Sequence, residues 1–158
     1  MPELTVSPLA RDEYPRFLEL VTETYANNAA ASGEMTFEQA RARAAQDLEA
    51  LLPKGPETPS MLLRSLHTAD QCVGHIWLGL RGAADAQYGW IWDIYVDPRH
   101  RGNQYGASAI RLIEAEAARF FGVTEVRLNV FATNAAAVHL YERLGYSVTS
   151  QVMRRSID

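Results

Sequence analysis

The stretch Asp93–Ala117, "DIYVDPRHRGNQYGASAIRLIEAEA", joins a strand-like segment to a helix through a loop with two glycines. The residues before the loop, "YGWIWDIYV" (88–96), are almost continuously apolar or aromatic, which indicates a strand buried on both faces. From Tyr105 onward, apolar residues recur at helical spacing, and Gly122 is placed to end that helix. This order predicts an α/β fold with the loop at the carboxyl end of its strand, where ligands bind in such folds.

The loop has the chemistry of an anion-binding turn. The first N–H groups of a helix lack intrahelical partners, and the helix dipole places partial positive charge there. Gly102 and Gly106 would let the backbone approach a diphosphate, and Arg101 would add charge. The alternative is a strand-to-helix turn that needs glycine only for its φ angle, and the two glycines alone do not decide between them. The residues required for a Walker loop or a dinucleotide fingerprint are absent.

The remaining hydrophobic pattern predicts the order β-α-α-β-β-β-α-β-α-β in a single domain over residues 1–158. Thr36 and Gln39 stand at capping-box spacing, and "NNAAASGE" (27–34) is expected to break the first helix. The expected helices are 14–25, 36–51, 105–121 and 135–144. The expected strands are 4–10, 60–67, 72–80, 88–96, 125–131 and 146–155.

Composition narrows the classes of function. The chain has 158 residues, a net charge of −4 and one cysteine, Cys72, so no intramolecular disulfide can form. We therefore expect a reducing, cytoplasmic setting, and we find neither a secretory signal nor an apolar run long enough to cross a membrane. No Cys/His spacing suggests a metal site, and basic residues form no long patch, so neither a metal nor nucleic acid is expected.

Two segments carry a family resemblance. The stretch 93–117 resembles the acyl-CoA-binding segment of the GNAT superfamily of N-acetyltransferases, whose hallmark is Arg/Gln-x-x-Gly-x-Gly/Ala. Arg101–Gly106 follows this pattern, except that Gln104 stands where the first required glycine belongs. A second segment, "LNVFATNAAAVHLYERLGYSVTSQVMRR" (128–155), resembles the closing region of the family, with Asn134 before a helix and Tyr141 within it.

The resemblance implies a GNAT fold, a central mixed and twisted β-sheet flanked by helices. It also implies acetyl-CoA as co-substrate, a primary amine as acceptor, no metal, and a homodimer that no single sequence feature demands. The backbone of the strand end should bond the pantetheine arm, and the loop amides should hold the CoA diphosphate. Asn134 should lie near the pantetheine, and Tyr141 near the thioester sulfur. The implied strand-end residues are Ile94, Tyr95 and Val96, and the implied diphosphate-binding residues are Arg101, Gly102, Asn103, Gln104, Tyr105, Gly106 and Ala107.

Acetyl transfer requires a neutral amine, a hydrogen-bond donor that stabilises the oxyanion of the tetrahedral intermediate, and a proton or hydrogen bond for the leaving thiolate. Tyr141 is the candidate for the last role, although Val138 and Tyr141 also fit a core stripe. Asp93 is a charge inside an apolar strand. It is either a base, directly or through a water, or an anchor for the incoming ammonium, or else a structural ion-pair member or a solvated aspartate at the sheet edge. A backbone N–H in the strand around Ile94 to Val96 is expected to donate the hydrogen bond to the oxyanion.

Several other residues could contribute to the site or to the core. His75 could face the acceptor, but a lone histidine among apolar residues is more often structural. Cys72 has no neighbouring base in sequence, so a covalent route is unsupported. The acceptor should be selected within Glu13–Leu52, whose acidic residues could bind a cation or form a solvated face. The candidates in that region are Glu19, Glu23 and Glu34, and Trp77, Trp90 and Trp92 are expected as core or cleft wall.

Two alternatives stay open: a fold of this type that senses acyl-CoA without turnover, and an enzyme that uses a larger acyl-CoA. Gln104 leaves a further question. At an ordinary φ it would be harmless, whereas a positive φ would strain the loop by about 1 kcal/mol or more.

Overall fold

The computed structural model describes residues 3–157 and contains a five-stranded sheet in the order β1-β2-β3-β4-β5. Neighbouring strands are antiparallel except for β4 and β5, which are parallel and connected through α3. The strands are β1 (Thr5–Pro8), β2 (Met61–His67), β3 (Cys72–Arg81), β4 (Tyr88–Val96) and β5 (Val126–Leu128). The α-helices are α1 (Tyr14–Ser32), α2 (Phe37–Leu51), α3 (Tyr105–Phe121) and α4 (Ala135–Arg143), and two short 3-10 turns are η1 (Gly55–Glu57) and η2 (Pro98–His100).

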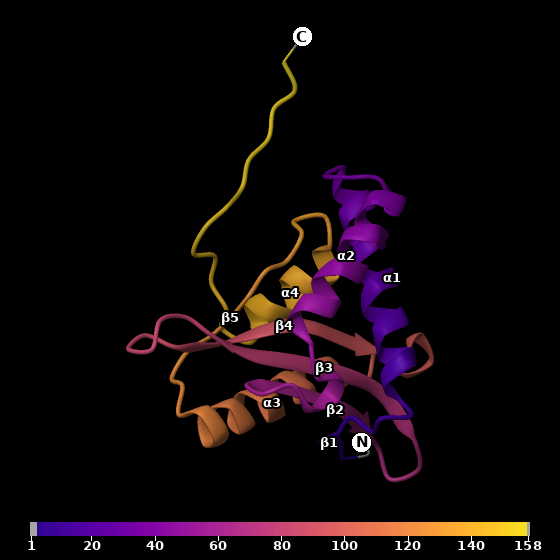
Figure 1. Cartoon of the computed structure of the whole chain (residues 1–158), viewed down its shortest axis with the longest axis vertical. Coiled ribbons are helices and arrows are strands. Elements are labelled where there is room, and N and C mark those ends of the chain that lie inside the picture. The colour runs from indigo at the N-terminus through magenta and orange to yellow at the C-terminus, as the bar shows by residue number, and fades with distance from the viewer. Residues whose placement is uncertain (1–2, 158) are drawn as a thin grey trace.

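Helices cover both faces of the sheet (Figure 1). On one face, Phe17 and Val21 of α1 and Leu48 of α2 pack with Trp77 of β3. On the other face, α3 contributes a stripe of fully buried side chains, including Ile110, to a core shared with β2, β3 and β4. This arrangement confirms the α/β fold class with a mixed sheet flanked by helices, and it places the loop after β4 at the strand's carboxyl end.

An extra residue in β4 changes which side chains face each layer. Trp77 of β3 pairs with Asp93 and Leu78 pairs with Ile91, so Trp92 has no partner and forms a β-bulge. The bulge reverses the alternation of side chains. Trp92 and Asp93 therefore face the α1/α2 side together, while Ile91 and Ile94 face α3. The unbroken apolar run in this strand reflects that reversal as well as burial on two faces.

The first helix is longer than predicted. The expected break at 27–34 is wrong, because α1 continues to Ser32 and ends at Gly33, whose φ of 75° is left-handed. Ala26 and Ala29 are fully buried against Ala40 of α2, so helix packing outweighs the poor helix propensity of the two asparagines. The capping box predicted for α2 is confirmed, since Thr36 and Gln39 bond to each other's backbone.

The last two predicted strands differ from the structure. β5 pairs with β4 over only three residues and does not reach Phe131. The strand predicted at 146–155 is wrong as part of this sheet, because residues 147–157 have no regular secondary structure and extend away from it (Figure 1). Tyr146 instead packs against Tyr141, and Arg154 bonds to carbonyls at the end of α1. Strand pairing requires a neighbouring edge, which hydrophobic alternation alone does not supply.

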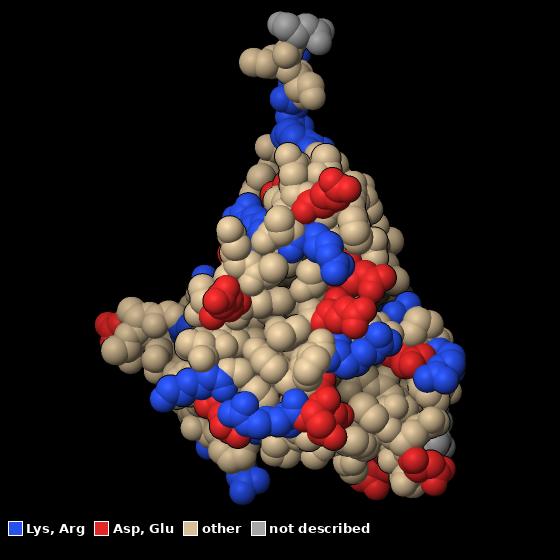
Figure 2. All heavy atoms as spheres, turned by 45° about the vertical axis from the view of Figure 1, so that its right-hand side comes forward, with Lys and Arg blue, Asp and Glu red and all other residues tan. Residues whose placement is uncertain are grey.

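Charges of both signs are interspersed on the face shown in Figure 2, where acidic and basic side chains border a broad uncharged area. None of the helices within residues 3–157 is long and apolar enough to cross a membrane. The same residues contain no group of three or more His, Cys, Asp or Glu side chains that could hold a metal ion.

Candidate active site

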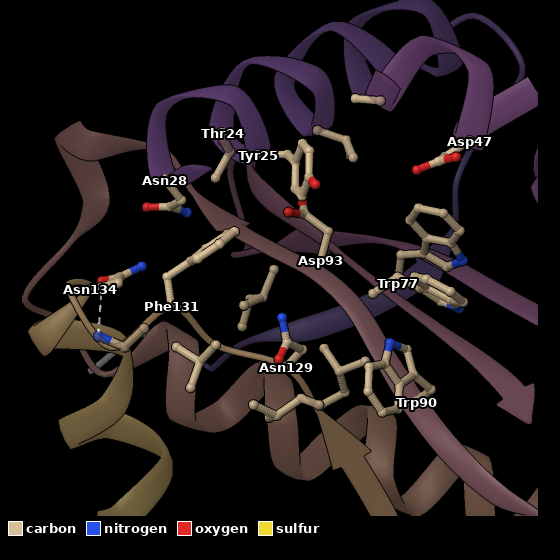
Figure 3. A pocket seen from close by; sticks show the side chains of 18 of the residues that line it. Thr24, Tyr25, Asn28, Asp47, Trp77, Trp90, Asp93, Asn129, Phe131 and Asn134 are labelled. Atoms are coloured by element: carbon tan, nitrogen blue, oxygen red, sulfur yellow. Dashed lines mark hydrogen bonds between the residues drawn. The ribbon is translucent and has the colours of Figure 1, made fainter. Parts of the chain in front are cut away.

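A cavity of about 430 Å³ opens where β4 and β5 separate. Their pairing ends at Ile91 and Leu128, so within residues 3–157 the side of β4 that faces β5 has no strand opposite it from Trp92 onward. The walls come from α1, α2, β3, β4, the segment after β5, and α4 (Figure 3). The polar and aromatic lining residues are Thr24, Tyr25, Asn28, Asp47, Trp77, Trp90, Trp92, Asp93, Asn129, Phe131, Asn134 and Tyr141.

Asp93 lies at the centre of this cavity and is held by His75. The His75 Nε2 and Asp93 Oδ2 atoms are 2.6 Å apart, and the two side chains are only 5% and 11% exposed. The second carboxylate oxygen, Oδ1, has no protein hydrogen-bond partner within residues 3–157 and is therefore free to meet a ligand. The imidazole also meets the ring of Phe17 edge to face and stacks on the ring of Tyr95.

Tyr141 reaches the same cavity from α4 and is 9% exposed. Burial, with a smaller contribution from the charge of Asp93, raises the pKa of Tyr141 to about 12. The phenol therefore keeps its proton at neutral and moderately alkaline pH, and it can act as a hydrogen-bond donor there. The ring of Tyr141 meets Tyr146 edge to face, and it is also part of the core around α3. The residue therefore packs in the core, and its hydroxyl is also available for chemistry in the cavity.

The loop between β4 and α3 is a tight turn with two residues in the left-handed region. Gly102 has a φ of 83°, and Gln104 has a φ of 62° and occupies the N-cap position of α3 without a side-chain cap bond. The Arg101 guanidinium bends back to donate to the Val96 carbonyl at 2.8 Å. Arg99 hydrogen-bonds to Asp97 and lowers the pKa of that carboxyl well below its usual range, which keeps the turn's acidic residue paired.

Tyr105 and Ala107, at the start of α3, could bind a ligand only through their backbone groups. The side chains of Tyr105 and Ala107 are buried, and that of Tyr105 belongs to the core beneath α3. Gly106 lies against α4, since a Cβ there would stand 3.3 Å from Leu140 Cδ2. Glycine at this position thus permits close approach of α3 and α4.

Asn134 lines the cavity and also caps α4, because its side-chain oxygen accepts a hydrogen bond from the Ala137 N–H at 3.2 Å. Figure 3 shows Asn134 at one end of the cavity, Trp77, Trp90 and Asp47 at the other, and Asp93 between them. The cavity therefore has two ends, and Asp93 lies between them.

The structure brings together four of the predicted site residues, since Asp93, Ile94, Asn134 and Tyr141 line one cavity. Tyr95, Val96 and residues 101–107 lie outside its lining, on the adjoining strand end and loop. The proposed acceptor glutamates, Glu19, Glu23 and Glu34, are exposed and do not line the cavity, and neither does Cys72.

Sequence reasoning missed the bond between His75 and Asp93 and the contribution of Asp47. His75 and Asp93 are eighteen positions apart on adjacent strands, so only the β3–β4 register brings them together. The sequence signal that could have indicated this pair is one charged residue and one histidine, each inside an otherwise apolar strand.

Comparison with known proteins agrees with this geometry. The sequence profile of the acetyltransferase (GNAT) family matches residues 19–146. The chain belongs to the GNAT family. Bacillus subtilis YycN, named an uncharacterized N-acetyltransferase, is 30% identical over 155 residues, which cover 98% of this chain and 99% of YycN. Its crystal structure superposes with a TM-score of 0.89 over 98% of this chain and 99% of that one.

A second Bacillus subtilis protein, YdgE, also named an uncharacterized N-acetyltransferase, is 24% identical over 169 residues, covering 97% of this chain and 98% of YdgE. This GNAT protein is accordingly an acetyltransferase, and acetyl-CoA is the co-substrate of its family.

Replacing Gln104 by glycine should stabilise this acetyltransferase. A non-glycine residue at φ of 62° carries local strain, so Gln104→Gly should raise the free energy of unfolding by up to about 1 kcal/mol. Urea denaturation measures this change, and Asn103→Gly in the same loop is the matched control, because Asn103 is not in the left-handed region. A loss of stability in Gln104→Gly beyond that of the control would show that the glutamine side chain itself holds the loop.

Proposed function

We propose that this acetyltransferase binds acetyl-CoA along the separated edge of β4 and transfers the acetyl group directly to a primary amine. The observation that supports this most is the placement of Asp93 and Tyr141 on one cavity at the point where β4 and β5 part. In this proposal, the free peptide groups after Trp92 bond the pantetheine arm as an added strand would. The turn from Arg101 to Ala107 holds the diphosphate with its amides.

Asp93 is proposed to prepare the amine. An ammonium cannot attack, so it must first give up a proton, and the free Oδ1 of Asp93 is the acceptor that faces the cavity. His75 acts as a positioning residue, since its bond to Oδ2 fixes the carboxylate and leaves Oδ1 directed at the ligand. Asp93 then releases the proton to solvent.

The acetyl transfer itself needs one further group, a proton donor for the leaving thiolate. The neutral amine attacks the thioester carbon, a C–N bond forms, and the carbonyl electron pair moves to oxygen, where a backbone N–H of residues 94–96 stabilises it. The C–S bond then breaks, and the thiolate takes the proton of the Tyr141 hydroxyl. The second proton lost by the nitrogen restores Tyr141 directly or through water, so the products are an amide, CoA thiol and one released proton.

Removing the Tyr141 hydroxyl should slow turnover and spare cofactor binding. We expect Tyr141→Phe to lower kcat by about 10²-fold, the usual contribution of a positioned proton donor, with little change in acetyl-CoA affinity. Thiol release and calorimetric titration measure the two quantities. Tyr146→Phe is the matched control, because the Tyr146 hydroxyl is buried without a partner and its loss should leave kcat unchanged.

An unchanged kcat in Tyr141→Phe would remove this residue from the proton-donor role. Binding of acetyl-CoA by the wild-type protein with no thiol release toward any amine would support the sensor interpretation instead.

Replacing Asp93 should produce a pH-dependent defect. Asp93→Asn should lower kcat/KM by about 10²-fold near neutral pH, and the defect should shrink as the pH approaches the pKa of the amine, because free amine then needs no base. His75→Gln, which retains an N–H donor, should keep most activity, whereas His75→Phe should show the Asp93→Asn profile in weaker form. A defect of equal size at all pH values would assign both residues a purely structural role.

A further inference from the structure

The guanidinium of Arg81 lies at the tryptophan end of the cavity and has no acidic partner. Its central carbon is 4.4 Å from the ring centroid of Trp90 and 5.3 Å from that of Trp92, and both rings line the cavity. None of the ion pairs formed within residues 3–157 involves Arg81, whose side chain is exposed. Contact with a ring face leaves the N–H donors of a guanidinium available for an anion.

The register of β3 places Arg81 on the same face of the sheet as the proposed base. Trp77, Gly79 and Arg81 occupy alternate positions of β3, so they share the face on which Trp77 packs against α1 and α2. A Cβ on Gly79 would stand only 2.8 Å from Trp92 Nε1, so glycine here makes room for the indole that Arg81 covers. Asp93 pairs with Trp77, and Arg81 lies four residues beyond Trp77, which separates the backbones of Asp93 and Arg81 by about 13 Å along the sheet.

The other charged groups at this end already have partners. Asp47 lies 3.8 Å from Arg43, one turn away on α2. Asp93 binds His75 through Oδ2, and its Oδ1 faces the cavity. A ligand at this end therefore meets a free carboxylate oxygen on Asp93 and an unpaired guanidinium on Arg81. Such a pattern is complementary to a molecule with an ammonium at one end and an anion at the other.

The surface between these two charges is apolar and flat. Trp77 and Trp92 stack with their ring centroids 5.4 Å apart, and Trp90 meets Trp92 edge to face at 6.0 Å. Figure 3 shows Trp77 and Trp90 together on one side of Asp93, and α2 adds two leucine side chains to the same lining. Walls of this kind favour a planar or aliphatic body.

From these positions we infer that the acceptor is a primary amine with a carboxylate at the far end of an apolar body. The inference rests on the proposed function and narrows its substrate: the amine meets Asp93, the body lies along the tryptophans, and the carboxylate binds Arg81. A carboxylate accepts two parallel N–H bonds from a guanidinium and carries the single negative charge that Arg81 balances. A phosphate monoester would bring further negative charge toward Asp47, so a carboxylate is the better match.

Arg81 is thereby a specificity-determining residue that takes no part in the chemical step. Its guanidinium lies away from the reacting atoms, so it should act on KM and leave kcat nearly unchanged. The alternative is an arginine that only covers apolar indole surface, as long basic side chains commonly do. A covering role would affect all acceptors equally, whereas binding of a carboxylate affects only those acceptors that carry one.

Two matched pairs of amines test the inference. The compounds para-(aminomethyl)benzoate and para-(aminomethyl)benzamide share a flat body, and ε-aminocaproate and ε-aminocaproamide share an aliphatic chain. Within each pair, the charge at the far end is the difference that matters. We expect kcat/KM, measured by thiol release with the wild-type enzyme and acetyl-CoA, to be about tenfold higher for the acid, a usual effect of hydrogen bonds to a charged group.

Replacing Arg81 should remove this preference. Arg81→Gln should raise KM for both acids by about tenfold and leave kcat and the kinetics of both amides nearly unchanged. Arg119→Gln is the matched control, because Arg119 lies over the Phe120 ring at 5.2 Å on α3, outside the cavity lining. The control removes the same charge from an aromatic ring and should keep the wild-type preference.

Four outcomes contradict the inference. Acetylation of all four amines without preference for the acids would overturn it and leave the proposed function intact. A preference for the acids that persists in Arg81→Gln would overturn the assignment of Arg81, and an equal loss for acids and amides would make Arg81 a purely structural residue. Binding of acetyl-CoA without acetylation of any of the four amines would overturn the inference and the proposed function together.

Discussion

The β-bulge at Trp92 is the constraint on which the site depends. One extra residue in β4 places Trp92 and Asp93 on the same face of the sheet and bends the strand away from β5. Without it, regular alternation would turn Asp93 toward the apolar core under α3, where an ionised carboxylate would be costly. The same local change therefore opens the cavity, exposes free peptide groups along its edge and aims a charge into it.

The charge in the cavity is retained because the surrounding groups are arranged for it. His75 satisfies one oxygen of Asp93, and contacts with the rings of Phe17 and Tyr95 restrict the imidazole. Removing only one member of such a buried pair would leave the other uncompensated. The charge of Asp93 also helps to keep Tyr141 protonated. The proposed base, positioning residue and proton donor are thus electrostatically linked, although they come from β4, β3 and α4.

The sequence alone predicted most of the fold, because each element carries its own local signal. Thr36 and Gln39 marked the start of α2, and Gly122 marked the end of α3. The errors occur where tertiary contacts outweigh local preference. Ala26 and Ala29 extend α1 through two asparagines because α2 covers them. The terminal segment has the alternation of a strand but pairs with no strand within residues 3–157, and no local pattern could indicate that.

The motif around Gly102 and Gly106, with Asn134 and Tyr141 downstream, was sufficient in the sequence to indicate the family and the loop that follows β4. The motif depends only on spacing along the chain, so it can be recognised without knowledge of the fold. The sequence could not decide the conformation of Gln104, the partner of Asp93 or the composition of the acceptor walls. Those depend on strand register, on a bulge of one residue and on the packing of α1 and α2, which bring together side chains that are distant along the chain. Only the tertiary structure brings Asp93 and Tyr141 to one cavity and places His75 against Asp93, and it does so because β3, β4 and α4 converge where two parallel strands separate.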